Sequence, residues 1–192
     1  MNPTKCYLMS SSTTQNYIFK EGKGGALTTN FTINFLSPPT SFMVSNSHYM
    51  IGLENGSIYY SKDDALLPFS ASRAVSKLYY NTSSLNLIVG DALGEILVAS
   101  REPSVGFSLN FSYHEHSCRI ISIIVVGDWI ITSDECGYIV QYDMVDQLLL
   151  DKTTHPGRTG NQKLMLTHWM DGDFGVGLVE NQSSVYLYRI SD

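Results

Sequence analysis

The sequence predicts an all-β fold made of repeated antiparallel sheets. Short segments that alternate apolar and polar residues run along nearly the whole chain, and tyrosine, phenylalanine and β-branched residues are abundant. One strand–turn–strand pattern returns four times, with turn residues 38, 43 and 46 residues apart at Gly56, Gly94, Gly137 and Ser183. A nearly fixed period in this range is typical of a repeat architecture.

Composition narrows the class of protein. With 43% apolar and 16% charged residues, residues 1–192 suffice for one domain with a substantial core. The net charge of −6 disfavours nucleic-acid binding, and no segment has the ~18–20 apolar residues of a membrane span or a signal peptide's apolar core. The cysteines (Cys6, Cys118, Cys136) are odd in number, which favours a reducing compartment over a disulfide framework. We therefore expect a cytoplasmic or nuclear protein.

The N-terminal segment 1–37 predicts two or three strands, within 5–35, and a partial blade that ends before Pro38. The Gly-rich segment 20–25 reads as a loop tip or a hairpin. It lacks the Lys-Ser/Thr pair and the following helix that a phosphate-binding loop needs.

Four units of antiparallel strands follow, with the boundaries 40–72, 74–113, 118–152 and 162–190. The first has strands at 41–45, 48–53, 57–61 and 66–70, and the second, which is the clearest, at 74–81, 85–91, 95–100 and 106–112. The last unit contains only three, at 163–170, 173–179 and 184–190. Period-2 alternation bounded by turn residues predicts each of these strands.

The third unit repeats the second, with strands at 119–126, 128–134, 138–143 and 147–151. Its apolar run 120–131 is interrupted by Gly127 and Asp128, which predicts two buried strands around a turn. The segment 143–152 could form a helical turn, because Met144, Val145, Leu148 and Leu149 share a helical face, but its place in the repeat favours a fourth strand.

An acid precedes each turn residue by two or three positions: Glu54, Asp91, Asp134 and Glu180. A carboxylate there can accept backbone N–H bonds and fix a tight bend. A sheet of about 40 residues cannot bury both faces alone, but sheets stacked around an axis can. The repeat therefore predicts a β-propeller of four-stranded blades, with four recognisable blades and an N-terminal partial blade.

The third unit resembles the WD-repeat family of β-propellers. His116 precedes Tyr142 and Asp143 by 26 residues, with Asp134 in the turn between them, as in that family's His, turn Asp and terminal Trp-Asp pattern. The resemblance implies a structural hydrogen-bonding set in which His116 bonds Asp134, with Thr132 or Ser133 as a further partner. Tyr142 stands where the family has Trp, so the chain is a divergent member of the pattern. In the fourth unit, His155 and Tyr188 are the possible equivalents.

The number of predicted blades allows several interpretations of how the ring is closed. Members of the family usually close with seven blades, which takes about 300 residues. The N-terminal strands could supply the missing strand of the last unit and close a five-bladed ring. Alternatively, the array stays open or is completed by another chain, or the chain is a fragment.

No pattern in the sequence names a reaction, a cofactor or a metal. The cluster His114, Glu115, His116 and Cys118 has zinc-ligand types, but a structural histidine is the stronger interpretation. The segment 171–175 carries alternating acids without the remaining ligands of a calcium loop, so it predicts a hairpin turn.

The aromatic residues fit inter-blade packing, and exposed ones on one rim would suit a protein interface. They are Tyr49, Tyr59, Tyr60, Tyr79, Tyr80, Tyr113 and Trp129.

We therefore expect a non-catalytic interaction scaffold that holds a protein partner within a larger intracellular complex. The alternative is an accessory or catalytic subunit of an enzyme that acts at the mouth of the propeller channel. The enzyme would bring several of His114, His116, Asp134, Asp171 and Asp173 together at one mouth. The scaffold would scatter them and present an apolar patch or an open edge.

Overall fold

The computed structural model describes the backbone of residues 6–11, 16–23, 26–45, 48–154, 164–168, 174–179 and 185–189, and the side chains of 35–45 and 48–154. Every regular element in these ranges is a β-strand. The described residues include no helix that is long and apolar enough to cross a membrane. Within each sheet, strands that follow one another in the chain pair antiparallel. The all-β prediction is confirmed.

Three complete four-stranded sheets form the centre of the molecule. Blade 1 contains β4 (Pro39–Ser45), β5 (His48–Leu53), β6 (Ile58–Tyr60) and β7 (Ala65–Leu66). Blade 2 contains β8 (Val75–Asn81), β9 (Asn86–Asp91), β10 (Ile96–Glu102) and β11 (Gly106–Tyr113). Blade 3 contains β12 (Ile120–Val126), β13 (Trp129–Asp134), β14 (Tyr138–Asp143) and β15 (Leu148–Thr154).

A three-stranded sheet stands at each end of this series. The N-terminal one contains β1 (Cys6–Ser11), β2 (Asn16–Lys23) and β3 (Ala26–Asn34), and the C-terminal one contains β16 (Leu164–His168), β17 (Phe174–Val179) and β18 (Val185–Arg189). Within the described residues, β1–β3 pair with one another and not with β18. The predicted fold class, a propeller of four-stranded blades with an N-terminal partial blade, is confirmed.

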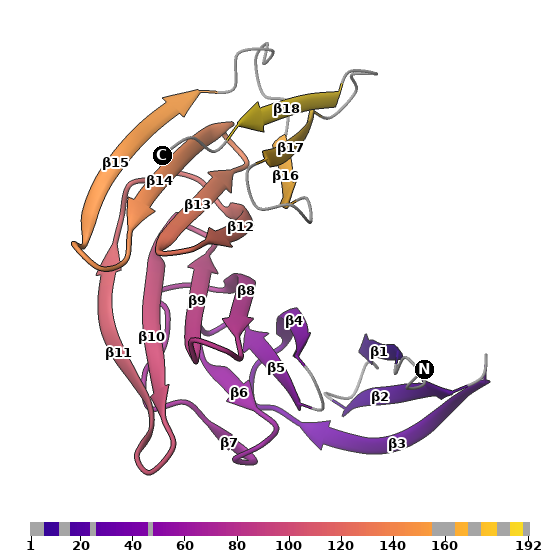
Figure 1. Ribbon diagram of the computed structural model, residues 1–192. Helices are drawn as coiled ribbons and strands as arrows, with labels where there is room; N and C mark the ends of the chain where they lie inside the picture. The colour runs from indigo at the N-terminus through magenta and orange to yellow at the C-terminus, as the bar shows by residue number, and fades with distance from the viewer. Residues whose placement is uncertain are drawn as a thin grey trace.

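The sheets follow one another along an arc (Figure 1). The first strand of each blade packs against the first strand of the next, β4 against β8, β8 against β12, and β12 against β16. These strands lie on the inner side of the arc, and β7, β11 and β15 lie on its outer side (Figure 1). The two ends of the arc, β1–β3 and β16–β18, lie apart in this view.

Both structural predictions for the third unit are confirmed. The apolar run 120–131 forms β12 and β13, which pair from Val126 opposite Trp129 across a turn in which Gly127 has a φ of +57°. Residues 148–154 form β15, which pairs with β14 and is a strand, not a helical turn. The hairpin register therefore overrides the helical spacing of the apolar residues in this segment.

The outer strand of blade 1 is shorter than predicted. We expected a strand over 66–70, but β7 contains only Ala65 and Leu66. The N–H of Leu67 still donates to the carbonyl of Ile58 over 2.8 Å. Pro68 follows, and because proline has no N–H to donate, the pairing ends there.

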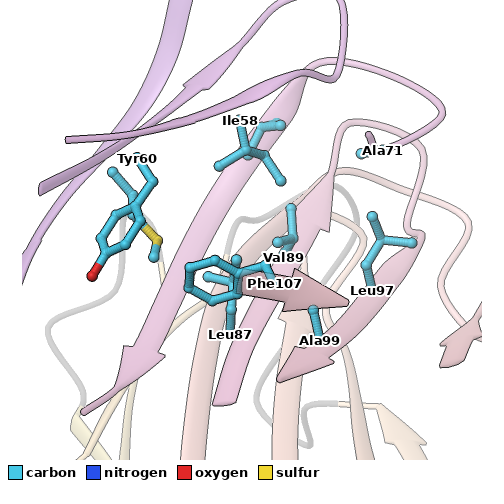
Figure 2. Close-up of a cluster of buried hydrophobic side chains, with 10 residues drawn as sticks. Ile58, Tyr60, Ala71, Leu87, Val89, Leu97, Ala99 and Phe107 are labelled. Atoms are coloured by element: carbon cyan, nitrogen blue, oxygen red, sulfur yellow. The ribbon is translucent and has the colours of Figure 1, made fainter. Parts of the chain in front are cut away.

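The central strand β9 packs against both neighbouring blades. Leu87 and Val89 belong to a core shared with Met50, Ile58 and Tyr60 of blade 1 (Figure 2). Ile88, between them in sequence, points to the opposite face and belongs to the core shared with blade 3, together with Ile120, Ile130 and Val140. Successive side chains of a strand face opposite sides of the sheet, so a blade covered on both sides needs apolar residues at consecutive positions. This is why β9 does not alternate.

Two glycines in central strands let the blades approach closely. A Cβ at Gly90 of β9 would lie 2.7 Å from the Cβ of Ile120, and a Cβ at Gly52 of β5 would lie 2.5 Å from the Cβ of Val75. Neither distance is possible in a packed protein. In each case the obstructing residue belongs to the inner strand of the next blade, so the missing side chain sets the spacing between blades.

Candidate functional site: the loop–turn junctions and the outer edge of blade 3

Each complete blade has a place where the loop that enters its first strand meets the turn between its second and third strands. We call this place the loop–turn junction. One backbone hydrogen bond marks it in every blade, from the N–H of Glu54, Ala92 and Glu135 to the carbonyls of Pro38, Ala74 and Arg119, respectively, over 2.7, 2.9 and 2.9 Å. The turn glycines Gly56, Gly94 and Gly137 have φ values of +87°, +94° and +81°, in the region that L side chains rarely adopt.

The junction of blade 3 contains a buried polar chain of three side chains. Nδ1 of His116 lies 3.1 Å from Oδ2 of Asp134, and Nε2 of His116 lies 2.7 Å from the hydroxyl of Thr132. Because a carboxylate can only accept, His116 donates from Nδ1 to Asp134. Its Nε2 pairs with the hydroxyl of Thr132, which also lies 3.5 Å from the carbonyl of Val140. His116 is 2% exposed and the other two are fully buried.

The carboxylate of Asp134 also fixes the turn. Its Oδ1 accepts from the N–H of Tyr138 over 2.9 Å, and its carbonyl accepts from the N–H of Gly137 over 3.0 Å. One side chain therefore joins the entering loop through His116 and the turn through Tyr138. Burial away from water makes each of these hydrogen bonds important, because a lost partner leaves a polar atom unpaired.

The equivalent positions follow from the marker bonds. In blade 2 they are Ala71 for His116, Val89 for Thr132 and Asp91 for Asp134. Oδ1 of Asp91 accepts from the N–H groups of Leu93 (2.8 Å) and Glu95 (2.9 Å), so it fixes the turn as the sequence predicted. Oδ2 of Asp91 is buried and has no hydrogen-bond partner among the described residues, because alanine stands where blade 3 has its histidine.

Blade 1 fills the same positions with apolar side chains. Phe35, Ile51 and Leu53 are all buried and belong to one core cluster with Tyr59. The prediction that Glu54 accepts the turn's N–H bonds is wrong, since Glu54 is exposed and its neighbour Leu53 holds the position of the acid. Glu180, the predicted acid of the last unit, lies outside the described residues.

Two members of the predicted hydrogen-bonding set lie elsewhere. Tyr142 and Asp143 are at the far end of β14, opposite Ile130 and Trp129. The hydroxyl of Tyr142 donates to the carbonyl of Gln147 over 2.8 Å, and Oδ1 of Asp143 accepts from backbone N–H groups in the β14–β15 turn. The structure thus brings His116, Asp134 and Thr132 together, without Tyr142 and Asp143. Ser133, the other suggested partner of His116, does not contact it in this way.

The chain Asp134–His116–Thr132 has the order of residues found in a hydrolase triad, but not its accessibility. A nucleophile must reach the substrate, and the hydroxyl of Thr132 belongs to a side chain with 0% exposure. Of the residues an enzyme would gather at a channel mouth, His114 is exposed and His116 and Asp134 are buried. Asp171 and Asp173 lie outside the described residues, as do His155 and Tyr188's side chain. The three residues therefore form a buried structural connection between the entering loop and the turn.

The candidate zinc ligands do not gather either. Within the described residues no group of three or more His, Cys, Asp or Glu side chains is placed to hold a metal ion. Cys118 instead forms a disulfide with Cys136. The expectation that the cysteines stay unpaired is therefore wrong for these two, which lie 18 residues apart in sequence and meet only at the junction of blade 3.

The aromatic residues that we considered as a binding face mostly pack between blades. Tyr60 contacts Tyr80 and Phe107 edge-on, with ring centroids 6.2 and 5.3 Å apart, and the guanidinium of Arg101 lies 5.7 Å from the Tyr60 ring. Burial raises the pKa of Tyr60 to about 12. Tyr113 stacks on the ring of blade 3's Tyr142 at 4.1 Å. These rings connect neighbouring blades.

A second candidate region is the outer edge of blade 3. All seven residues of β15 are exposed, and three consecutive leucines are 57%, 42% and 46% exposed: Leu148, Leu149 and Leu150. Val145 in the preceding turn is 67% exposed. Because β15 pairs only with β14 among the described strands, its other edge presents unpaired backbone groups beside an apolar surface.

Comparison with known proteins identifies the fold but not a family. No family model and no curated protein matches the sequence. The computationally designed Ika4 protein is similar in structure, with a TM-score of 0.65 and 17% identity over 82% of this chain and 94% of that one. A chain in the crystal structure of a mitotic checkpoint complex gives a TM-score of 0.72 and 13% identity, over 97% of this chain and 58% of that one. This chain therefore spans little more than half of the checkpoint-complex chain.

Proposed function

We propose that this chain is a divergent WD-repeat-like scaffold, a non-catalytic propeller that holds a protein partner within a larger intracellular complex. The observation that carries the proposal is the exposed edge of β15. An edge strand with a free backbone and three exposed leucines would accept an extended apolar segment by strand addition. Native edge strands are often protected by charges, prolines or bulges. In β15 the charged residues Asp151 and Lys152 and the register shift follow Leu148 and Leu149, which stay exposed.

Two further observations support parts of the proposal. The buried His116–Asp134 pair has the partners that the WD-repeat resemblance implies, which favours membership of that family. Among the described strands the C-terminal sheet has three, where blades 1 to 3 have four, which favours a partner that completes the propeller. The net charge of −6 disfavours nucleic acid as that partner. The proposed location is the cytoplasm or the nucleus.

Affinity purification with matched variants tests the proposal. The tagged chain is compared with a variant carrying Leu148→Ser and Leu150→Ser, and with a control carrying Leu66→Ser and Val105→Ser, which changes apolar residues exposed to 54% and 75% on blades 1 and 2. We expect a stoichiometric protein partner that is retained by the control and lost, by tenfold or more, from the β15 variant. Recovery of no stoichiometric partner by a soluble, monodisperse wild-type chain would contradict the scaffold function.

A further inference from the structure

The disulfide Cys118–Cys136 joins the two halves of a single loop–turn junction. Cys118 lies in the loop that enters β12, and Cys136 lies in the turn between β13 and β14, with 5.8 Å between their Cα atoms. Both residues are only partly buried. The bond therefore lies in the partly exposed part of the blade 3 junction, next to the buried pair of His116 and Asp134.

Blade 1 makes the same connection without a covalent bond. Counted from the marker bonds, Ser37 and Asn55 are the equivalents of Cys118 and Cys136. The N–H of Asn55 donates to the hydroxyl of Ser37 over 3.0 Å. In blade 2 the entering loop is held differently, by the N–H of Ser72, which donates to the carboxylate of Glu95 over 2.9 Å. The entering loop is thus held in all three blades, and only blade 3 uses a disulfide for it.

The rest of the blade 3 junction does not depend on the disulfide. The N–H of Glu135 donates to the carbonyl of Arg119 on the strand side of the cysteines. The buried pair of His116 and Asp134, with the N–H of Tyr138, holds the loop and the turn on the other side. If the sulfur–sulfur bond is cleaved, these contacts keep the two thiols close to each other. A high effective concentration of one thiol near the other lets the bond form again.

We propose that Cys118 and Cys136 form a reversible dithiol–disulfide switch that tightens or loosens the loop–turn junction of blade 3. In the reducing step, a thiolate of a small-molecule thiol attacks one sulfur, and the Cys118–Cys136 bond breaks to give a mixed disulfide and one protein thiol. A second small-molecule thiol displaces the first as a low-molecular-weight disulfide. Two electrons and two protons pass to the protein, and the reverse step uses a small-molecule disulfide as oxidant.

The intracellular location that we propose agrees with a switch, and the switch does not depend on it. Disulfides are rare in reducing compartments, and those that occur there in mesophiles are usually catalytic or redox-sensing. A switch requires that the fold survives the loss of the bond. Blade 1 has the same junction without a disulfide, and this supports the switch wherever the protein resides.

Thiol trapping in redox buffers tests the proposal directly. The chain with Cys6→Ser, which leaves only the two junction cysteines, is equilibrated in mixtures of reduced and oxidised glutathione and alkylated without denaturant. We expect both cysteines to become alkylated together as the buffer becomes reducing, and to be protected again on reoxidation, with unchanged circular dichroism. A bond that resists reduction until the protein unfolds, or thiols that never pair in oxidising buffer, would refute the switch.

A transplant of the blade 1 junction provides the matched control. Cys118→Ser combined with Cys136→Asn reproduces the pair Ser37 and Asn55 at the junction of blade 3. Reduction of the Cys6→Ser chain should lower its thermal midpoint by about 5–10 °C, since closure of a loop of this length constrains the unfolded chain. The transplant variant should fold, and its thermal midpoint should be the same under reducing and oxidising conditions. If neither the transplant nor the reduced chain folds, the disulfide is a permanent requirement of the fold and the proposal is wrong.

Discussion

Blades 1 and 3 fill the same three buried positions with opposite chemistry. Blade 1 uses Phe35, Ile51 and Leu53, which belong to one apolar cluster. Blade 3 uses His116, Thr132 and Asp134, in which His116 is hydrogen-bonded to both of the others. The backbone around the two sets is the same, with one marker bond and a positive-φ glycine in each. The propeller backbone therefore requires three buried side chains at this junction, but it accepts either apolar or hydrogen-bonded ones.

Blade 2 lies between these two solutions. It keeps the acid, Asp91, but has Ala71 where blade 3 has histidine, and one oxygen of the carboxylate is left without a partner among the described residues. A polar network is strongly stabilising only when every member is satisfied. The three blades thus form a series from apolar through half-satisfied to fully paired, within one chain.

The largest effect is expected where the network is complete. Asp134→Ala would leave His116 buried without its acceptor and would free the N–H of Tyr138. A hydrogen bond to a charged group contributes about 1.5–3 kcal/mol, and the carboxylate of Asp134 accepts two, so their loss costs about 3–5 kcal/mol. We expect a loss of that size in the free energy of unfolding, measured by urea denaturation at pH 7. A loss below about 1 kcal/mol would show that water or a rearranged loop replaces the carboxylate.

The same substitution in blade 2 should cost less and so sharpen the comparison. Asp91→Ala removes the acceptor for the N–H groups of Leu93 and Glu95, but it also removes an unpaired buried oxygen. We expect a loss of about 1–2 kcal/mol, close to that of a helix cap or a similar side-chain-to-backbone anchor. Equal losses for Asp91→Ala and Asp134→Ala, in parallel denaturation curves, would mean that His116 contributes nothing to the difference.

The interfaces between blades also bury tyrosines, and the pH dependence of stability tests their contribution. Burial raises the pKa of Tyr60, at the interface of blades 1 and 2, to about 12, and it also raises the pKa of Tyr113, which packs against blade 3. Because the phenolate is disfavoured in the folded state, the contribution of Tyr60 is fully present below pH 10 and is lost as pH rises through 12.

pH 11 lies one unit above the ordinary tyrosine pKa of 10 and one unit below the raised pKa of Tyr60. At this pH the contribution of Tyr60 to stability has therefore fallen by about 1 kcal/mol. Tyr60→Phe should therefore reduce the loss of stability between pH 8 and pH 11 by about that amount, as followed by urea midpoints at the two pH values. An unchanged alkaline loss in the variant would assign the effect to other tyrosines.

The sequence predicts the blades better than their junctions, for a physical reason. Alternation, tight-turn glycines such as Gly94 and the doubly buried strand around Ile88 are local signals, and each corresponds to a strand or turn in the structure. The junctions depend on which loop residue meets which turn residue, about 18 positions apart. Local spacing indicated Glu54 as the acid of blade 1, but the register places Leu53 there.

The disulfide and the far placement of Tyr142 were missed on the same ground. An odd count of cysteines carries no information about Cys118 and Cys136 in particular, because their proximity is created by the antiparallel pairing of β12 with β13. One signal was present: Cys118 lies nine residues before Gly127 and Cys136 lies eight residues after Asp128, so the two cysteines are almost equally far from the predicted turn. Residues that are equally far from the turn of an antiparallel hairpin lie opposite each other, so these two cysteines are expected to meet.

The smallest effect is expected from exchanging one complete solution for another. A triple variant of blade 3, with His116→Phe, Thr132→Ile and Asp134→Leu, reproduces the apolar set of blade 1. Replacing a buried polar network by apolar residues of similar volume is often close to neutral, so we expect a change within about 1 kcal/mol, measured by the same urea denaturation.

This expectation reverses the usual rule that more substitutions cost more, because the single change Asp134→Ala should destabilise the chain further than all three together. In blade 1 the N–H of Ser57 donates to the side chain of Asn55, but blade 3 has Cys136 at that position. The N–H of Tyr138 therefore loses its side-chain acceptor in the triple variant, and this loss accounts for the expected cost of up to about 1 kcal/mol. A triple variant that is less stable than Asp134→Ala would show that blade 3 requires its polar junction, and that the three junctions are not interchangeable.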